Sequence, residues 1–359
     1  MRPRREQVEV DVVSTYHCTS RCVRRALLLG REEDRLLWRK RWIESRLREI
    51  VQYFAVDVDT FNVMDNHLHL VLTIRPDIAA KWSNYGVARR WLAYHPPKTR
   101  LGDRPARDLE IANLARDTER IKVLRERLCS LSEFHKAIKE PLARQVNREE
   151  GVTGHFWEGR FHTRRILDEA SRLAVMAYVD LNSVRACQAR TPEESEFSGI
   201  YHRTRARAGA MAKMSRRDRT KALRDAASRG GSARDCVQFP VEPVPSILTP
   251  IRTTPKRRGV FLSIELDEYL HIVDRMGRLK HPGKTGRIPS ELAPILDRLD
   301  VTSESMMSEI VATKTWRGSV IGLAASCQEE ARRRGRKRLI SAMAIEAVER
   351  RKTQSGAVT

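Results

Sequence analysis

Two histidines lie two residues apart in the segment HLHLVLTI, residues 67–74. Side chains alternate between the two faces of a β-strand, so His67 and His69 face one way while the leucines beside them face the other. The leucine face fits a hydrophobic core, and we therefore expect both imidazoles to leave the sheet on its open face. Placed like this, they can bind one metal ion and leave coordination positions for substrate oxygens. A pair of ordinary surface histidines is the alternative.

A tyrosine and an asparagine lie four residues apart in the segment YVDLN, residues 178–182. On a helix this spacing places Tyr178 and Asn182 on one face. The side-chain oxygen of an asparagine is a suitable ligand for a hard divalent metal ion. Considered alone, the pair also fits a tyrosine at the rim of a core and a polar residue at a helix end. The histidine pair in the same chain favours the chemical interpretation.

Together these four side chains form a minimal set for cutting a phosphodiester bond. A tyrosine phenolate can attack phosphorus while a metal ion neutralises the non-bridging oxygens and the 3′-oxygen leaves in line. Tyrosine ionises near pH ~10, so a cation must favour the phenolate or a base must accept its proton. We predict that Tyr178 is the nucleophile and that the two histidines and Asn182 bind the metal.

Arginines and aromatic residues lie near the predicted site in the sequence. Proteins that bind single strands stack bases on aromatic side chains and contact the backbone with arginines. We predict that one tryptophan and four arginines contact DNA, with ordinary surface charge and a core aromatic as the alternative. These residues are Trp157, Arg160, Arg164, Arg165 and Arg185.

Four segments of the chain together resemble the single-tyrosine HUH transposases, and among them the REP-associated tyrosine transposases. Their order and spacing match over roughly Val8 to Val184, about half of the chain, and the combination is far more specific than any one motif. The segments are YHCTSRCVRRALLLG (Tyr16 to Gly30), MDNHLHLVL (Met64 to Leu72), GHFWEGRF (Gly154 to Phe161) and AYVDLNSVRA (Ala177 to Ala186).

This resemblance implies an α+β fold, a ferredoxin-like or RRM-like domain with a central antiparallel sheet. It implies a homodimeric, metal-dependent tyrosine transposase that cleaves and rejoins single-stranded DNA near hairpins. His67 and His69 correspond to the metal-binding pair, with Mg²⁺ or Mn²⁺ as the ion, and Asn182 to the third ligand. Tyr178 corresponds to the nucleophile, which forms a 5′-phosphotyrosine intermediate and leaves a 3′-hydroxyl.

Two features depart from the family pattern. The family helix usually reads YxxxNPVRA, and Ser183 occupies the proline position here, which changes the helix geometry but removes no catalytic group. The region 77–150 and the tail after Arg205 exceed a minimal transposase. A domesticated DNA- or RNA-binding protein with idle chemistry is therefore the alternative function, although the intact site residues favour the enzyme. A replication initiator or relaxase is disfavoured because Tyr178 follows the histidine pair.

Hydrophobic patterns predict the elements that position these residues. Val8 to Ser20 is rich in β-branched residues and predicts a strand, and Arg31 to Phe54 has the pattern of an amphipathic helix. Val56 to Met64 and His67 to Ile74 predict a β-hairpin, joined by an Asp-Asn dipeptide that suits a tight turn.

The predicted tyrosine helix follows a further strand. Phe156 to Ile166 reads as a strand that carries arginines. Asp168 is the expected N-cap of the helix that bears Tyr178, with Glu169 favourably placed near the positive end of the helix dipole.

Composition divides the chain into three regions. Residues 1–200 are expected to form the catalytic domain, with a helical insertion at 77–150. Residues 201–255 are expected to be a basic and proline-rich linker, because eleven Lys or Arg stand against three Asp between Tyr201 and Asp235. Residues 256–359 are expected to be a mostly helical, basic region that adds reach toward DNA and no chemistry.

The overall charge points to a polyanionic partner. Lys and Arg outnumber Asp and Glu by 68 to 46, a net charge of +22, which favours single-stranded or hairpin DNA through counterion release. The absence of a run of about 18 apolar residues and the polar first residues predict a cytoplasmic, nucleoid-associated protein without membrane contact. Six cysteines without a CxxC pair favour reduced thiols over disulfides or a zinc ribbon.

Overall fold

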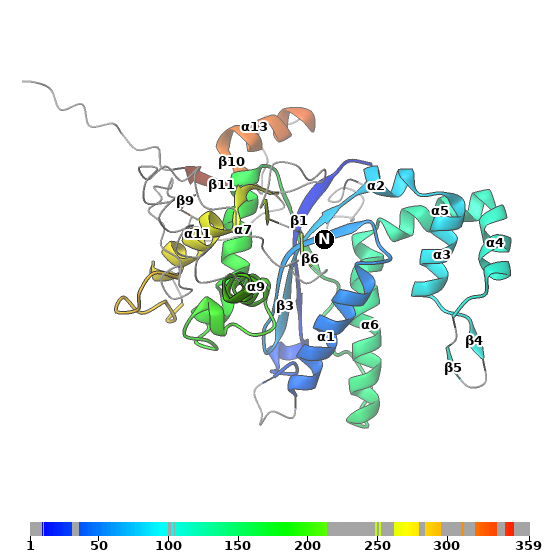
Figure 1. Ribbon diagram of the computed structural model, residues 1–359, viewed down its shortest axis with the longest axis horizontal. Helices are drawn as coiled ribbons and strands as arrows, with labels where there is room; N and C mark the ends of the chain where they lie inside the picture. The colour runs from blue at the N-terminus through cyan, green and yellow to red at the C-terminus, as the bar shows by residue number, and fades with distance from the viewer. Residues whose placement is uncertain are drawn as a thin grey trace, which may run out of the picture.

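A mixed α+β fold is built around one sheet in the computed structural model (Figure 1). The structure describes residues 9, 11–30, 36–99, 102–103, 105–213, 248–249, 251–252, 262–279, 284–295, 310–311, 320–335 and 342–347.

Within these described residues the main sheet has seven strands in the order β2-β3-β1-β6-β10-β11-β9. β1 lies between β3 and β6 and is antiparallel to both, and β10 continues the sheet parallel to β6. β2 and β3 form the predicted hairpin, whereas the first strand begins later than predicted. The strands are β1 (Ser14–Arg21), β2 (Val56–Val63), β3 (His67–Ile74), β6 (His162–Ile166), β9 (Ile310–Val311), β10 (Val320–Leu323) and β11 (Ala342–Ala347).

A β-bulge in β2 lies at Asp59, between the pairs Val58–Leu72 and Thr60–Val71. The extra residue shifts the side-chain alternation by one position. Val56 and Val58 before it and Phe61 and Val63 after it therefore pack in the same core. The bulge thereby places two consecutive residues, Asp59 and Thr60, on the other face of the sheet, where both form hydrogen bonds to α7.

One face of the sheet packs against α1 (Leu37–Ile50) and α6 (Leu131–Glu149) (Figure 1). The leucines of β3 and Ile74 belong to this first core, as the alternation in HLHLVLTI predicts. The connection from β3 to β6 is largely helical and extends to one side. Its remaining elements are α2 (Pro76–Lys81), α3 (Asn84–Tyr94), β4 (Lys98–Thr99), β5 (Gly102–Asp103), α4 (Asp108–Arg116) and α5 (Thr118–Leu128).

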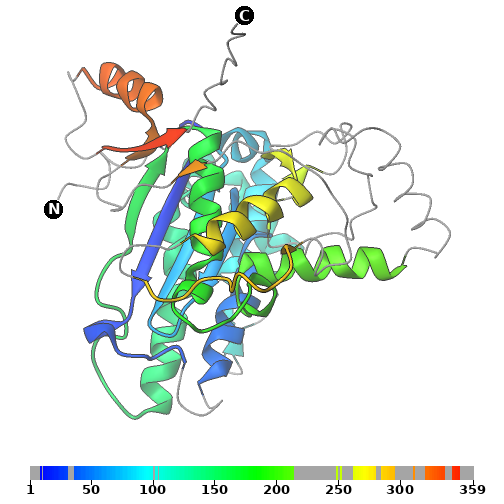
Figure 2. The ribbon, with the colours of Figure 1, turned by 90° about the vertical axis from the view of Figure 1, so that its left-hand side faces the viewer.

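The opposite face of the sheet is covered by α7 (Glu169–Asp180), α9 (Gly199–Lys213) and α11 (Leu266–Arg278). Figure 2 shows α7 lying along the strands and α11 crossing it. A second core forms there, in which α7 and α11 pack against Val71 of the sheet. The expectation that the histidines leave the sheet on an open face is therefore wrong, since helices from later in the chain cover that face.

The later part of the chain also differs from the predicted linker and helical region. Arg203 and Arg207 of α9 are buried. Arg207 forms a bidentate ion pair with Asp267 of α11. β10 and β11 add strands to the main sheet, next to α13 (Ala324–Arg333). Residues 214–247 of the predicted linker lie outside the described residues. The other short elements are η2 (Val23–Arg25), α8 (Asn182–Arg185), η3 (Pro192–Glu194), β7 (Ile251–Arg252) and β8 (Leu262–Glu265).

Candidate functional site

The two predicted histidines lie next to each other at one end of β3. The ring centroids of His67 and His69 are 4.7 Å apart and their planes are nearly perpendicular. His67 is half-buried, and its Nδ1 lies 2.6 Å from Oδ1 of Asn66. His69 is only 6% exposed. The pair is thus held at the buried edge of the second core.

A third histidine, His17 of β1, completes the cluster. Its Nε2 lies 2.9 Å from Nδ1 of His69, and the two rings are stacked with centroids 5.1 Å apart. Thr19 Oγ1 lies 3.3 Å from the same Nδ1 of His69. The sequence analysis missed His17, although the alternation of β1 places Thr15, His17 and Thr19 on one face and could have indicated it.

Tyr178 faces this histidine cluster from α7. Its ring centroid lies 6.3 Å from that of His69 and 6.3 Å from that of His17, both in edge-on orientation. The guanidinium carbon of Arg185 lies 5.6 Å from the centroid of the tyrosine ring. The structure therefore brings the predicted nucleophile and the predicted metal-binding pair together across the seam between the sheet and α7.

Burial sets the protonation of the cluster. It raises the pKa of the Tyr178 phenol, which the positive charges of Arg185 and Arg164 partly offset. It lowers the pKa of His67 to about 4 and that of His17 to about 3, and that of His69 well below its usual value. At neutral pH the imidazoles are thus neutral, the form that binds metal ions.

Asn182 starts α8, directly after a break in the helix at Leu181. Its side-chain amide donates to the backbone oxygen of Tyr178 at 3.1 Å. Because the amide nitrogen is held by the helix, the amide oxygen is the atom that a metal ion would use. Ser183, in the position of the family's proline, donates from Oγ to Oδ1 of Asn62 on β2 at 3.1 Å.

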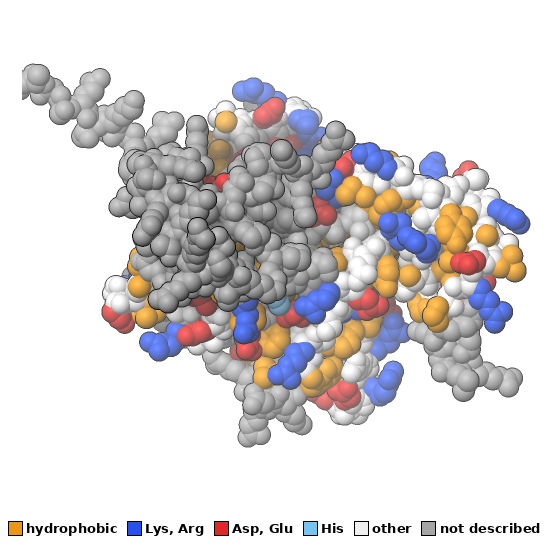
Figure 3. Space-filling view, viewed as in Figure 1, with side chains coloured by type: hydrophobic (Ala, Val, Ile, Leu, Met, Phe, Trp, Pro, Cys, Tyr) orange, Lys and Arg blue, Asp and Glu red, His pale blue; other side chains and the backbone are white. Residues whose placement is uncertain are grey.

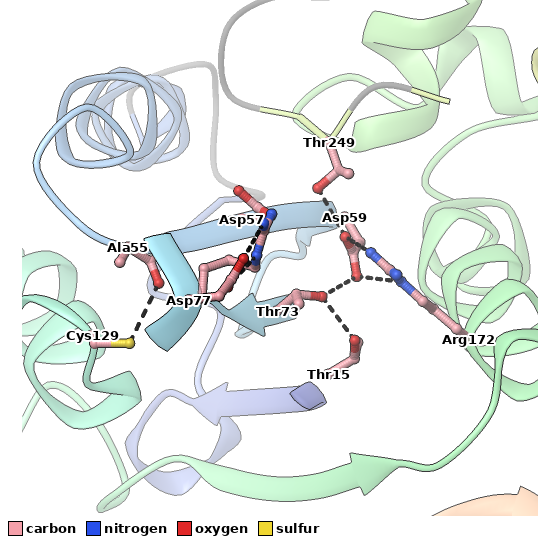
Figure 4. Close-up of polar contacts among 10 residues, drawn as sticks. Thr15, Ala55, Asp57, Asp59, Thr73, Asp77, Cys129, Arg172 and Thr249 are labelled. Atoms are coloured by element: carbon pink, nitrogen blue, oxygen red, sulfur yellow. Dashed lines mark hydrogen bonds and ion pairs between the residues drawn. The ribbon is translucent and has the colours of Figure 1, made fainter. Parts of the chain in front are cut away.

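Buried polar contacts fix the N-terminal half of α7 to the sheet. Asp168 is the N-cap, as predicted, and accepts a hydrogen bond from the backbone of Ser171. Arg172 donates from Nε to the fully buried carboxylate of Asp59 at 2.8 Å, and Thr73 donates to the same carboxylate at 3.0 Å. Figure 4 shows Asp59 between these two partners.

The C-terminal half of α7, which bears Tyr178, is held in the same way. Asn62 donates from its amide to the backbone oxygen of Val179 at 3.0 Å. The carboxylate of Asp180 is fully buried and accepts hydrogen bonds from Thr60 and from Tyr269 of α11. Burial raises the pKa of this carboxyl, which the charge of Arg203 partly offsets. These contacts place the Tyr178 ring relative to β3.

The predicted DNA-contacting arginines separate into two sets. Arg164 is half-buried on the strand beside His17, and together with Arg185 it acts on Tyr178. Arg165 points the other way and forms ion pairs with Glu9 at 2.9 Å and Glu330 at 3.1 Å. Only the first set lies at the candidate site.

Trp157 and Arg160 lie in the loop before β6, and they differ in burial. The Trp157 ring is 7% exposed in the first core and donates its N–H to the backbone oxygen of Lys139 at 3.0 Å. A ring buried in this way does not present a face for base stacking. Arg160 is exposed.

Positive charge is spread over the surface in Figure 3. On the face shown, the Lys and Arg side chains of the described residues lie among acidic and apolar side chains. In the part of the chain that the structure describes, no helix is both long and apolar enough to span a membrane.

The donor set at the site fits a divalent ion by its chemistry. Both hydrogen bonds of His69 use Nδ1, so Nε2 is the atom that would reach a metal. His67 and the Asn182 oxygen are the other proposed donors. Among the described residues, no group of three or more His, Cys, Asp or Glu side chains has the arrangement of a metal site. The proposed metal ligands differ from such a group, because they are two histidines and the amide oxygen of Asn182.

Comparisons with known proteins add little to this geometry. No protein-family model matches the chain, and no curated protein matches it. Among solved structures, one similar chain is a REP-associated tyrosine transposase bound to a REP hairpin, with 11% sequence identity and a TM-score of 0.33. The match covers 56% of this chain and 83% of the other. At that score the likeness carries no argument about function.

Proposed function

We propose that this protein cleaves and rejoins single-stranded DNA through a covalent bond to Tyr178. The observation that carries the proposal is the position of the Tyr178 ring, 6.3 Å from the rings of both His69 and His17 and next to Arg185. Sequence motifs far apart in the chain predicted that a tyrosine nucleophile and a pair of metal-binding histidines would lie close together. Their meeting at the seam between α7 and β3 supports that prediction.

In the proposed cleavage step, the phenol oxygen of Tyr178 forms a bond to phosphorus and the bond from phosphorus to the 3′-oxygen breaks. The phenol proton is lost and the departing 3′-oxygen gains a proton, which gives a 5′-phosphotyrosine and a 3′-hydroxyl. Attack of a 3′-hydroxyl on the phosphotyrosine reverses the exchange and rejoins the strand. No external energy source is needed, because one phosphodiester replaces another.

The side chains at the site have separate roles in this proposed step. Since burial raises the pKa of Tyr178, the phenol is protonated at neutral pH and needs a cation to favour the phenolate. Arg185 and Arg164 supply positive charge next to the ring. Mg²⁺ or Mn²⁺ held by His67, His69 and Asn182 would supply Lewis-acid stabilisation of the non-bridging oxygens.

The fold supports the finer assignment to a ferredoxin-like transposase domain. The strand order β2-β3-β1-β6, with α1 and α6 on one face, is consistent with two βαβ halves that form an antiparallel sheet. We propose single-stranded or hairpin DNA as the substrate, in keeping with the net charge of +22. The homodimer stays a prediction from the resemblance.

Covalent trapping tests the proposal. The protein is incubated with labelled single-stranded hairpin DNA from the flanks of its own gene, with and without Mg²⁺ or Mn²⁺. We expect a denaturant-resistant adduct that mass spectrometry locates at Tyr178. Tyr178→Phe removes only the nucleophilic oxygen and should abolish the adduct while DNA binding stays close to wild type. Tyr85→Phe, at a tyrosine 42% exposed on α3, is the matched control and should form the adduct normally.

The same assay tests the metal. His67→Ala combined with His69→Ala should remove the stimulation of adduct formation by Mg²⁺ or Mn²⁺. An adduct that persists in Tyr178→Phe, or metal stimulation that is unchanged in the double variant, would contradict the assignment of that residue set. DNA binding without any adduct in the wild-type protein would instead favour the domesticated binding protein.

A further inference from the structure

Asn62 of β2 lies on the face of the sheet that α7 covers, and its side chain is fully buried. The bulge at Asp59 shifts the alternation of β2, so that Asn62 faces α7 and does not enter the first core. On its other side in the sheet, Asn62 is the register partner of His69 on β3. This asparagine thus lies between a proposed metal ligand and the helix of the proposed nucleophile.

The amide of Asn62 forms one hydrogen bond to each of two helices. Nδ2 donates to the backbone oxygen of Val179 in α7 at 3.0 Å, and Oδ1 accepts from Ser183 Oγ in α8 at 3.1 Å. The first bond fixes the orientation of the amide, because a carbonyl oxygen only accepts and the NH₂ group must face it. Sδ of Met64 lies 3.7 Å from the same serine oxygen and is a weaker acceptor. Asn62 therefore joins the two helices across the break at Leu181.

Both bonds lie directly beside the groups of the proposed reaction. The side-chain amide of Asn182 donates to the backbone oxygen of Tyr178 at 3.1 Å and to that of Val179 at 3.5 Å. The Val179 oxygen is thus shared by Asn182 and Asn62. Because Ser183 follows Asn182 directly, Asn62 holds the start of α8 as well as the end of α7. The separation between the phenol oxygen of Tyr178 and the amide oxygen of Asn182 therefore depends on Asn62.

The bond to α8 requires a side-chain donor at position 183, where the family helix has proline. Proline has neither a hydroxyl nor a backbone N–H, so it could not donate to Asn62. In this chain the departure from the family pattern is matched by a buried polar side chain that faces it.

We propose that Asn62 and Ser183 form a clamp that holds the proposed nucleophile and the proposed amide ligand at a fixed separation. Both are positioning residues, which act through Tyr178 and Asn182. The inference rests on the proposed function, since it concerns the same site. It gives the serine at the family's proline position a role of its own.

Mn²⁺ binding tests the clamp without the DNA reaction. Ser183→Ala removes only the hydroxyl. We expect the Mn²⁺ dissociation constant, from electron paramagnetic resonance titration, to rise about 10- to 100-fold, as it does when a group that orients a metal ligand is lost. Ser183→Thr keeps the hydroxyl and should bind Mn²⁺ like wild type. Thr204→Ala is the matched control, because the Thr204 hydroxyl is also buried and donates to the backbone oxygen of Ile200 at 3.0 Å, within α9.

Covalent trapping at saturating Mn²⁺ distinguishes the two bonds of the clamp. Ser183→Ala loses only the bond to α8, so its rate of adduct formation should return close to wild type once the metal site is filled. Asn62→Leu also loses the bond to α7, and its rate should stay about 10-fold or more below wild type, because the nucleophile is misplaced. DNA affinity of both variants in the Tyr178→Phe background should match that background alone. Urea unfolding establishes that each variant is folded under the assay conditions.

The outcomes separate the clamp from the proposed function. Unchanged Mn²⁺ affinity in Ser183→Ala, or an equal loss in Thr204→Ala, would overturn the clamp and leave the proposed function standing if the wild-type protein forms its adduct. No adduct in the wild-type protein, with weaker Mn²⁺ binding in Ser183→Ala and not in Thr204→Ala, would overturn the chemistry and support the clamp. A wild-type protein that binds no Mn²⁺ would overturn the metal site and the clamp together.

Discussion

At the scale of single residues, His17 is the group that most constrains the candidate metal pair. The contact between His17 Nε2 and His69 Nδ1, at 2.9 Å, fixes the orientation of the His69 ring and leaves Nε2 for a metal. Metal-binding histidines commonly depend on such a partner for their orientation. His17 is therefore a positioning residue in the proposed site, and it acts through His69.

His17→Gln should weaken metal binding without unfolding the protein. Loss of an orienting partner typically lowers metal affinity by about 10- to 100-fold. We expect the Mn²⁺ dissociation constant, measured by electron paramagnetic resonance titration, to rise by that factor while the melting temperature changes little. Ser14→Ala, a small change on the opposite face of the same strand, is the control. Unchanged Mn²⁺ affinity in His17→Gln would show that His69 does not depend on this contact.

At the scale of elements, the placement of Tyr178 depends on polar contacts beneath α7. Asp59 lies at the bulge in β2 and faces α7, where Arg172 satisfies its buried carboxylate (Figure 4). A buried charge without its partner is costly, whereas an exposed ion pair contributes little. The pair therefore matters for the helix that carries the proposed nucleophile.

Arg172→Ala should destabilise the protein by about 3–5 kcal/mol, because it leaves the buried carboxylate of Asp59 without its charged partner. Arg144→Ala is the control, since Arg144 pairs with Glu140 on the surface of α6 with side chains 66% and 44% exposed. That change should cost no more than about 1 kcal/mol. Urea unfolding of both variants measures the difference, and equal losses would rule out a special role for the buried pair.

At the scale of the whole molecule, the two halves of the chain share the main sheet and the second core. β10 pairs with β6, and Tyr269 of α11 is buried against α7. Tyr269 also donates a hydrogen bond to Asp180, close to the proposed nucleophile. The described part of the C-terminal third is thus integrated with the candidate site.

A chain that ends after Glu196 should not fold stably, because it lacks α9, α11 and β10. Each fully buried Leu or Val contributes roughly 1.5–3 kcal/mol, so the loss of Leu270 and Val273 alone removes about 3–6 kcal/mol, which reaches the lower end of the total stability of about 5–15 kcal/mol typical of a protein. We expect aggregation or a broad thermal transition by calorimetry. A chain that ends after Ala347 retains every described element and should melt like the full chain. A cooperative, wild-type transition in the shorter chain would contradict this integration.

Features that depend on neighbouring residues could be predicted from the amino-acid sequence. The alternation in HLHLVLTI predicted which face of β3 packs in the first core, and Asp168 was predicted as the helix cap because capping is a local hydrogen bond. The spacing of Tyr178 and Asn182 likewise indicated a helical site. These inferences need only the period of a strand or a helix.

The surroundings of those residues depend on contacts between distant segments and became visible only in the folded chain. His17 meets His69 because β1 pairs with β3 in one particular register, and Gly286 comes close to the backbone of α8 because it carries no side chain. The burial of the histidine face likewise comes from α7 and α11, whose packing no local pattern in β3 can reveal. Contacts between segments distant in the chain depend on register and packing, which residue spacing within one segment does not specify.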